Sequence, residues 1–221
     1  MLRGIFVTGT DTGVGKTVVS AALMHRYRAD APLRYWKPIQ TGAGRDDDTA
    51  EAGRLAGCQP DELFASGIRL PHPVSPHLAA SLSGTTIHLQ TLVDSMNGER
   101  PSTRWIVEGA GGVLVPVNEC DLMIDMMNLL QLPVVVAART ALGTINHTLL
   151  TLEALRSRAL HVAGVVMVGD GNASNRAAIE RYGDVKVLGE MPCFRQLTAD
   201  ALSSWAMTQL DPRRDLLSWL Q

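Results

Sequence analysis

Gly9-Thr10-Asp11-Thr12-Gly13-Val14-Gly15-Lys16-Thr17 is a glycine-bearing loop between an apolar strand, predicted over residues 4–8, and a helix, predicted from residue 18 onward. Strand, loop, Gly-Lys-Thr and helix in this order are typical of a phosphate-binding loop. The glycines let the backbone approach an anion closely, and the unpaired N–H groups at a helix start favour negative charge. We therefore predict that Lys16 contacts phosphate oxygens and that the Thr17 hydroxyl binds Mg²⁺.

The spacing inside this loop departs from the usual pattern. Five residues separate Gly9 from Gly15, whereas the common motif G-x-x-x-x-G-K-[ST] has one fewer at this place. An alternative interpretation is a glycine-rich strand-to-helix turn that carries a surface lysine. Because Gly-Lys-Thr follows an apolar strand so closely, we favour the phosphate-binding loop.

Composition limits the classes of protein to which the chain can belong. Its 221 residues suit one domain over residues 1–221, and an apolar fraction of 46% is enough for a sizeable core. The formal net charge of −2 predicts no broad surface for nucleic acid, and no apolar run is long enough to span a membrane. The first predicted strand begins almost at the N-terminus, so we expect no signal or transit segment. The widely spaced Cys58, Cys120 and Cys193 indicate reduced thiols in a cytoplasmic protein.

Strands and helices are predicted to alternate along the chain. The predicted strands cover residues 4–8, 33–37, 105–107, 133–138, 162–168 and 185–188. The predicted helices begin at residue 18 and near residue 49, and cover residues 87–96, 122–130, 145–155, 173–182 and 197–210. Residues 57–84 contain several prolines and are predicted to form a long functional loop flanked by short helices. This alternation indicates an α/β fold with a mostly parallel sheet and helices on both faces.

Four loops are expected to meet at one edge of this sheet, because ligands of such sheets bind at the carboxyl ends of the strands. These loops are residues 9–17, 37–44, 108–112 and 139–146. Within the second of them, residues 40–44 are predicted to be a flexible loop.

Three charged residues near these loops are candidates for chemistry on a triphosphate. Lys37 ends a predicted buried strand on the side of the phosphate loop, where its ammonium group could stabilise a transferred phosphoryl group. Glu108 ends another strand and Asp48 precedes a helix, so both carboxylates are candidate Mg²⁺ ligands beside Thr17. The alternatives are a lysine extended along the surface, a solvated strand end and a helix cap. His77, taken alone, is more typical of a structural histidine.

Six segments of the sequence form a recognisable series. They are Gly9-Thr10-Asp11-Thr12-Gly13-Val14-Gly15-Lys16-Thr17, Trp36-Lys37-Pro38, Ser75-Pro76-His77, Val107-Glu108-Gly109-Ala110-Gly111-Gly112, Gly143-Thr144-Ile145-Asn146-His147 and Gly189-Glu190-Met191-Pro192. In this order, and over nearly the whole chain, they resemble the dethiobiotin synthetase family of biotin biosynthesis, whose fold is of the P-loop NTPase type. The longer first loop is itself the form found in that family.

The resemblance implies an enzyme, an ATP-dependent cyclo-ligase. In the family, one amine of 7,8-diaminononanoate takes up CO₂ to give a carbamate, and MgATP phosphorylates the carbamate to a carbamic–phosphoric anhydride. The second amine then closes the ureido ring and releases phosphate. The resemblance therefore implies Mg²⁺ as the cofactor, ATP as co-substrate, and a homodimer with the substrate site at its interface.

The resemblance also implies roles for individual residues. The implied catalytic residues are Lys37, Lys16 and Thr12, and the implied Mg²⁺ ligands are Thr17, Asp48 and Glu108. The implied nucleotide contacts are Gly13, Val14, Gly15, Lys16, Thr17, Val18, Asp48, Glu108, Gly109, Ala110, Gly111, Gly169, Asp170, Pro192, Cys193 and Phe194. The implied substrate contacts are Thr41, His77, Gly111, Leu142, Gly143, Thr144 and Asn146.

Two alternatives stay open at this point. Members of the family often carry an Asn-Asp pair that reads adenine, where this chain has Gly169-Asp170, so nucleoside triphosphates other than ATP remain candidates. The alternative function is an ATPase switch of the same fold, of the partitioning or site-selection type. Those proteins carry a second lysine early in the loop, where this chain has Asp11.

Overall fold

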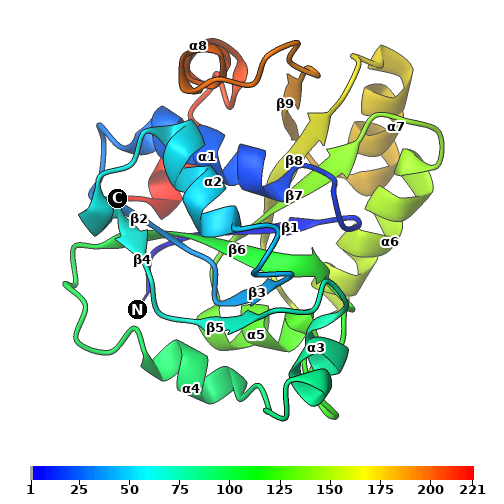
Figure 1. The fold of residues 1–221 in the computed structure, drawn as a ribbon. Helices are drawn as coiled ribbons and strands as arrows, with labels where there is room; N and C mark the ends of the chain where they lie inside the picture. The colour runs from blue at the N-terminus through cyan, green and yellow to red at the C-terminus, as the bar shows by residue number, and fades with distance from the viewer. Residues whose placement is uncertain (1) are drawn as a thin grey trace.

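A sheet of seven parallel strands forms the centre of the protein, whose computed structural model describes residues 2–221 (Figure 1). From one edge to the other the strands are β4 (Leu63–Phe64), β2 (Leu33–Trp36), β6 (Arg104–Gly112), β1 (Gly4–Gly9), β7 (Val134–Arg139), β8 (Val162–Val168) and β9 (Val187–Met191). All six residues of β1 are buried. Continuous apolar strands of this kind are expected where helices cover both faces of a parallel sheet.

Helices cover the two faces of the sheet in two separate layers (Figure 1). One layer contains α1 (Lys16–Tyr27), α2 (Asp48–Ala56), α8 (Ala199–Gln209) and the 3₁₀ helix η2 (Asp215–Trp219). The other contains α3 (Pro76–Leu82), α4 (Leu89–Asp94), α5 (Met123–Leu130), α6 (Thr144–Ser157) and α7 (Ala173–Gly183). Each layer buries its own apolar core against the sheet, which confirms the predicted α/β class with helices on both faces.

A second, two-stranded sheet lies beside the main one and was not expected. It pairs β3 (Ile39–Thr41) with β5 (Ile68–Leu70) in parallel. The prediction of a flexible loop at 40–44 was therefore wrong in part. Within 57–84 the predicted short helices are present as η1 (Pro60–Glu62) and α3, but the predicted loop between them also contains the strands β4 and β5. Gly67 allows this pairing, since a Cβ atom there would lie 2.8 Å from the carbonyl oxygen of Pro38.

Two strands differ by more than one residue from their predicted bounds. β6 continues through Gly112, where a glycine-rich loop was expected, and β9 covers 187–191 instead of 185–188. In β6 the glycines allow close packing, because a Cβ at Gly109 would lie 3.0 Å from the ring of Phe6. Gly112 is paired with Gly9 in the neighbouring strand. Sequence patterns that treat glycine as a loop residue therefore place the end of this strand too early.

The C-terminal segment is fastened to α1 by a buried carboxylate. Asp211 is only 1% exposed and accepts hydrogen bonds from the Tyr27 hydroxyl and from the Leu216 N–H. Arg26 donates to the carbonyl oxygens of Leu210 and Asp211. These bonds hold the end of the chain near its beginning, and Figure 1 shows the two termini on the same side of the molecule.

Within residues 2–221, none of the helices is both long and apolar enough to cross a membrane.

Candidate functional site

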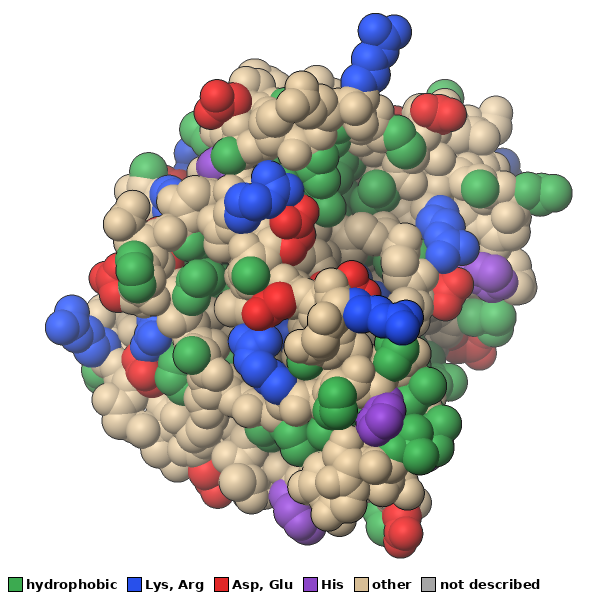
Figure 2. All heavy atoms as spheres, viewed as in Figure 1, with side chains coloured by type: hydrophobic (Ala, Val, Ile, Leu, Met, Phe, Trp, Pro, Cys, Tyr) green, Lys and Arg blue, Asp and Glu red, His purple; other side chains and the backbone are tan. Residues whose placement is uncertain are grey.

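The loop between β1 and α1 has the backbone geometry of an anion-binding site. Gly13 and Gly15 both have positive φ, 69° and 95°, a region that residues with a Cβ atom rarely adopt. Gly15 is the N-cap of α1 and no side chain caps this helix start. The first N–H groups of α1 therefore stay available for an oxyanion. Figure 2 shows a hollow near the middle of this face of the protein, with acidic and basic side chains along its lower rim.

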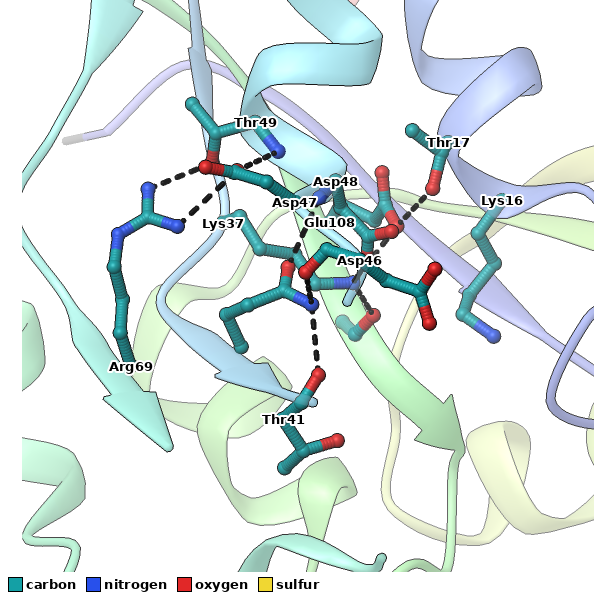
Figure 3. A network of polar contacts seen from close by, with 12 residues as sticks. Lys16, Thr17, Lys37, Thr41, Asp46, Asp47, Asp48, Thr49, Arg69 and Glu108 are labelled. Atoms are coloured by element: carbon teal, nitrogen blue, oxygen red, sulfur yellow. Dashed lines mark hydrogen bonds and ion pairs between the residues drawn. The ribbon is translucent and has the colours of Figure 1, made fainter. Parts of the chain in front are cut away.

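The Lys37 ammonium group lies between two carboxylates at the end of β2 (Figure 3). Its Nζ is 2.7 Å from Oδ2 of Asp48, 2.8 Å from Oε1 of Glu108 and 3.0 Å from the Gly109 carbonyl oxygen. The Lys37 and Glu108 side chains are 3% and 1% exposed, and Asp48 is 30% exposed. A buried lysine held by two carboxylates is not a residue extended along the surface, so that alternative for Lys37 is excluded.

Glu108 is the centre of this cluster, because both of its carboxylate oxygens have donors. Thr17 donates to Oε1 at 2.9 Å, the same oxygen that binds Lys37. The Tyr35 hydroxyl donates to Oε2 at 2.8 Å. Burial, and then the charge of Glu108, raise the pKa of Tyr35 well above its ordinary value, so its hydroxyl stays a donor.

Tyr35 is a residue of the site that the sequence analysis missed. It lies two positions before Lys37, and in an extended segment such residues point to the same side. That spacing is the one signal the sequence offered. By holding Oε2, Tyr35 leaves Oε1 of Glu108 directed at Thr17 and Lys37.

Asp48 is free to bind a cation because its neighbour performs the helix cap. Asp47 is the N-cap of α2, and its side chain accepts from the N–H groups of Thr49 and Ala50. The alternative of a helix-capping role for Asp48 is therefore wrong. Asp48 is instead the first residue of α2, and its carboxylate turns toward Lys37.

The two lysines of the site have pKa values that are shifted in opposite directions. Burial, and then the positive charge of Lys37, lower the pKa of Lys16 from its ordinary value to about 8. Burial also opposes the charge of Lys37, but the carboxylates of Glu108 and Asp48 outweigh it and raise the pKa of Lys37. The carboxylates of Glu108 and Asp48 thus act on both ammonium groups and favour the charged form of each.

The beginning of the phosphate loop is held from β7. Arg139, at the end of that strand, donates to the Thr12 carbonyl oxygen at 2.9 Å and lies 3.4 Å from Oδ2 of Asp11. Lys16 donates to the Asp11 carbonyl oxygen at 3.0 Å. The predicted catalytic residues Thr12 and Lys16 therefore belong to one connected loop.

The oxygen donors present suit Mg²⁺. Asp48 and Glu108 provide carboxylate oxygens that contact Lys37, and Thr17 provides a hydroxyl that is hydrogen-bonded to Glu108. Mg²⁺ usually takes one or two carboxylates together with substrate phosphates. No group of three His, Cys, Asp or Glu residues that could hold a metal occurs within residues 2–221. These three side chains would therefore hold Mg²⁺ together with phosphate oxygens of the nucleotide.

The segments predicted to surround the base are neighbours in space. Gly169 and Asp170 follow β8. The N–H of Gly169 donates to the carbonyl oxygen of Met191, which ends β9 and precedes the predicted contacts Pro192, Cys193 and Phe194. Gly169 has φ 136°, and a Cβ atom there would lie 2.3 Å from the Thr140 hydroxyl. A larger residue at 169 therefore requires Thr140 to move.

The predicted substrate contacts are divided between two places. Thr41 ends β3 close to the Lys37 cluster (Figure 3). Leu142, Gly143 and Asn146, around the start of α6, are exposed, and Leu142 is fully so. Thr144 is buried and donates to the Arg139 carbonyl oxygen.

His77 lies apart from the residues that bind Lys37. Together with parts of 85–88 and 117–121 it lines a cavity of about 650 Å³. None of Lys16, Lys37 and Thr41 lines that cavity. The backbone N–H of His77 donates to the carbonyl oxygen of Pro116, which immediately precedes the cavity-lining segment 117–121.

The remaining predicted nucleotide contacts lie in the phosphate loop or next to it. Val14 is a buried residue of the loop, and Val18 follows the loop in α1. Gly109, Ala110 and Gly111 continue β6, which pairs with β1. The loop and the end of β6 therefore line the same edge of the sheet.

Two solved structures share this fold. A ParA family ATPase from Chlorobium tepidum TLS has a TM-score of 0.54 and 10% identity, over 93% of this chain and 98% of that one. The septum site-determining protein MinD from Pyrococcus horikoshii OT3 has a TM-score of 0.57 and 14% identity, over 100% and 95%. The predicted α/β fold, with a mostly parallel sheet and helices on both faces, is thus shared with both of these proteins. At such identities the likeness concerns the fold alone, so it gives no support to a partitioning or site-selection function.

Sequence comparison identifies much nearer relatives. A family model described as an AAA domain matches residues 3–201. The bifunctional biotin biosynthesis protein BioCD of Bordetella avium is 48% identical over 98% of this chain and 45% of its own length. The ATP-dependent dethiobiotin synthetase BioD of Agrobacterium fabrum is 45% identical over 89% of each chain. That of Paramagnetospirillum magneticum is 50% identical over 91% of this chain and 94% of its own. This chain therefore belongs to the dethiobiotin synthetase family.

Proposed function

We propose that this protein makes the ureido ring of dethiobiotin from 7,8-diaminononanoate, CO₂ and MgATP. As a member of its family it is an ATP-dependent ligase. The observation that carries the proposal is the position of Lys37, which lies between Asp48 and Glu108 beside the phosphate loop. A phosphoryl transfer to a carboxylate-like acceptor needs positive charge at this point, between donor and acceptor.

The proposed reaction has three steps. One amine attacks CO₂, loses a proton and becomes a carbamate. A carbamate oxygen then attacks the γ-phosphorus of ATP, and ADP leaves, which gives a carbamic–phosphoric anhydride. The second amine attacks the carbonyl carbon and loses a proton, and inorganic phosphate leaves as the ring closes. Phosphorylation is required because a carbamate oxygen is a poor leaving group, whereas phosphate is a good one.

The chain's own residues would hold and polarise the reacting groups. Lys16 and the free N–H groups of α1 would bind the phosphates, and Lys37 would stabilise charge on the carbamate and the transferred phosphoryl group. Thr12 and Thr41 would contact the reacting groups by their hydroxyls. Thr17, Asp48 and Glu108 would hold Mg²⁺, which would supply positive charge for the phosphoryl transfer.

A homodimer would complete the substrate site. The exposed Leu142 and Asn146 lie at the start of α6, whose N-terminal N–H groups suit a carboxylate. Other large apolar side chains that are exposed include Val74, Leu78 and Leu82. Figure 2 shows apolar side chains gathered over the end of the molecule where α3 lies. In the proposed dimer, α6 of one subunit would present its start to the diamine bound in the other.

A product assay tests the proposed function. Purified protein is incubated with the diamine, bicarbonate, Mg²⁺ and each nucleoside triphosphate in turn, and the cyclic urea and the nucleoside diphosphate are measured. We expect urea and diphosphate in equal amounts, and only when both diamine and bicarbonate are present. The panel also determines the base preference, which the glycine at 169 leaves open. Substantial hydrolysis without diamine, together with no urea, would favour a nucleotide switch.

Binding of ADP is expected to take up a proton at pH 8.5. The Lys16 ammonium loses its proton at about pH 8 in the free protein, and bound phosphate favours the protonated form. The dissociation constant should therefore rise above pH 8, by at most about tenfold per pH unit. Calorimetry at pH 8.5 in two buffers with different ionisation enthalpies measures the uptake. Lys16→Arg, whose charge does not titrate, serves as the control. Equal heats in both buffers for the wild type would contradict the expectation.

A further inference from the structure

Gln40 is a buried side chain whose hydrogen bonds join three parts of the site. It is 3% exposed. Its Nε2 donates to the carbonyl oxygens of Thr41, at 2.9 Å, and Asp46, at 3.3 Å. Its Oε1 accepts the N–H of Asp48 at 3.2 Å. Figure 3 shows Thr41, Asp46 and Asp48 gathered around this point. One amide therefore fixes both the end of β3 and the start of α2.

Arg69 holds the same helix start from the neighbouring strand. It is paired with Gln40 in the register of β3 and β5. Its guanidinium donates to Oδ1 of Asp47 at 3.2 Å and to the Thr49 hydroxyl at 3.1 Å. Gln40 thus binds Asp48 itself, while Arg69 binds the residues immediately before and after it.

We propose that Gln40, supported by Arg69, is a positioning residue that sets where the Asp48 carboxylate lies relative to Lys37 and the metal. The proposal rests on the proposed Mg²⁺ role of Asp48. The small β3–β5 sheet is then the support of the metal site. Residues that orient metal ligands by hydrogen bonds commonly change metal affinity 10- to 100-fold when they are replaced.

The amide group is suited to this position because it both donates and accepts. Gln40→Met keeps the length of the side chain but removes all three hydrogen bonds. Gln40→Glu keeps the acceptor for the Asp48 N–H. It places a carboxylate oxygen against the carbonyl oxygens of Thr41 and Asp46, where a donor is needed. Both variants should release Asp48 from its place, for different reasons.

The test is the binding of Mn²⁺, used as a probe for Mg²⁺, to the full chain saturated with ADP. Electron paramagnetic resonance distinguishes free from bound Mn²⁺, and the samples contain neither diamine nor bicarbonate. The result is therefore independent of whether the urea is formed. We expect Gln40→Met to weaken Mn²⁺ binding about tenfold, and to change the dissociation constant of metal-free ADP by less than about twofold. Gln90→Met, a glutamine that donates to Asp94 on the exposed face of α4, is the matched control and should bind Mn²⁺ like the wild type.

A double-variant comparison separates positioning from general destabilisation. If Gln40 acts through Asp48, then Gln40→Met should add no further loss of Mn²⁺ affinity to Asp48→Asn. Because Gln40 is buried, Arg69→Gln is measured as well, since it breaks only partly exposed contacts; we expect about threefold weaker Mn²⁺ binding. Unchanged Mn²⁺ affinity in the folded variants would overturn the proposal, even if they melt at a lower temperature. The proposal would also be overturned if Gln40→Met lowered Mn²⁺ affinity by the same factor in the wild type and in Asp48→Asn.

Discussion

Replacing Lys37 by methionine is expected to lower the turnover of the ring-closing reaction by a factor of about 10² to 10³, the usual effect of removing one group that stabilises developing charge. The dissociation constant for ATP should change by less than about threefold, because the phosphates are held chiefly by Lys16 and the start of α1. Methionine is similar in length to lysine, so it fills the buried space. The measurement is steady-state formation of the cyclic urea, with ATP binding by calorimetry.

The chain offers a matched control for this substitution. Lys186 carries the same charge but lies on the surface, where its Nζ is 2.8 Å from Oδ2 of Asp215. Lys186→Met should leave turnover within about twofold of the wild type, since a surface ion pair contributes little. Wild-type turnover in Lys37→Met would remove Lys37 from the mechanism. A parallel loss of ATP affinity would instead assign it to ground-state binding.

The position of the site was predictable wherever strand direction determines it. Lys37 follows β2 directly and Glu108 lies within β6; the two strands are adjacent and parallel, so these residues had to lie near each other. The helix that begins at Lys16 follows β1, the strand on the other side of β6. Chain order and parallel pairing thus bring Lys37, Glu108 and Thr17 together without any information on side chains.

The residues that orient these groups were not predictable in the same way. Tyr35 and Glu108 are 73 residues apart in the chain, and their hydrogen bond depends on side-chain conformation as well as strand order. Gln40 belongs to a three-residue strand, which is too short for an alternating pattern to appear. Its partner strand β5 is equally short and is followed by a proline-rich segment. Local sequence patterns therefore indicate the charged groups of the site but not their supports.

The N-cap of α2 also could not be assigned from the local sequence pattern. Asp46, Asp47 and Asp48 are consecutive, and the pattern alone makes each a candidate cap. The backbone of Asp47 is extended and that of Asp48 is helical, which gives the cap to Asp47. Only then is the Asp48 carboxylate available to Lys37. A shift of one residue in the helix start would exchange a structural role for a functional one.

Glu108→Gln is expected to lower the free energy of unfolding at pH 7 by about 3 kcal/mol, because it leaves a buried ammonium group without its buried partner. Of its two carboxylate partners, Lys37 would keep only Asp48, which is partly exposed. In the wild type the pKa of Lys37 is raised, so the pair's contribution is present at neutral pH and is lost only as pH rises through that raised value. Without the charge of Glu108, one of the causes that raise the pKa of Lys37 is lost, so the variant should lose the remaining contribution of Lys37 at a lower pH than the wild type.

Removing the charge of Lys37 as well should restore much of the stability that Glu108→Gln loses. The double variant Lys37→Met with Glu108→Gln contains no buried unpaired charge, and its neutral amide still accepts from Thr17 or Tyr35. We expect it to be more stable than Glu108→Gln alone by about 2 kcal/mol, measured by urea denaturation at pH 7, although it should form no urea product. Additive losses in the double variant would mean that the two side chains stabilise the fold independently. The ion pair would then not be the interaction that joins β2 to β6 at the site.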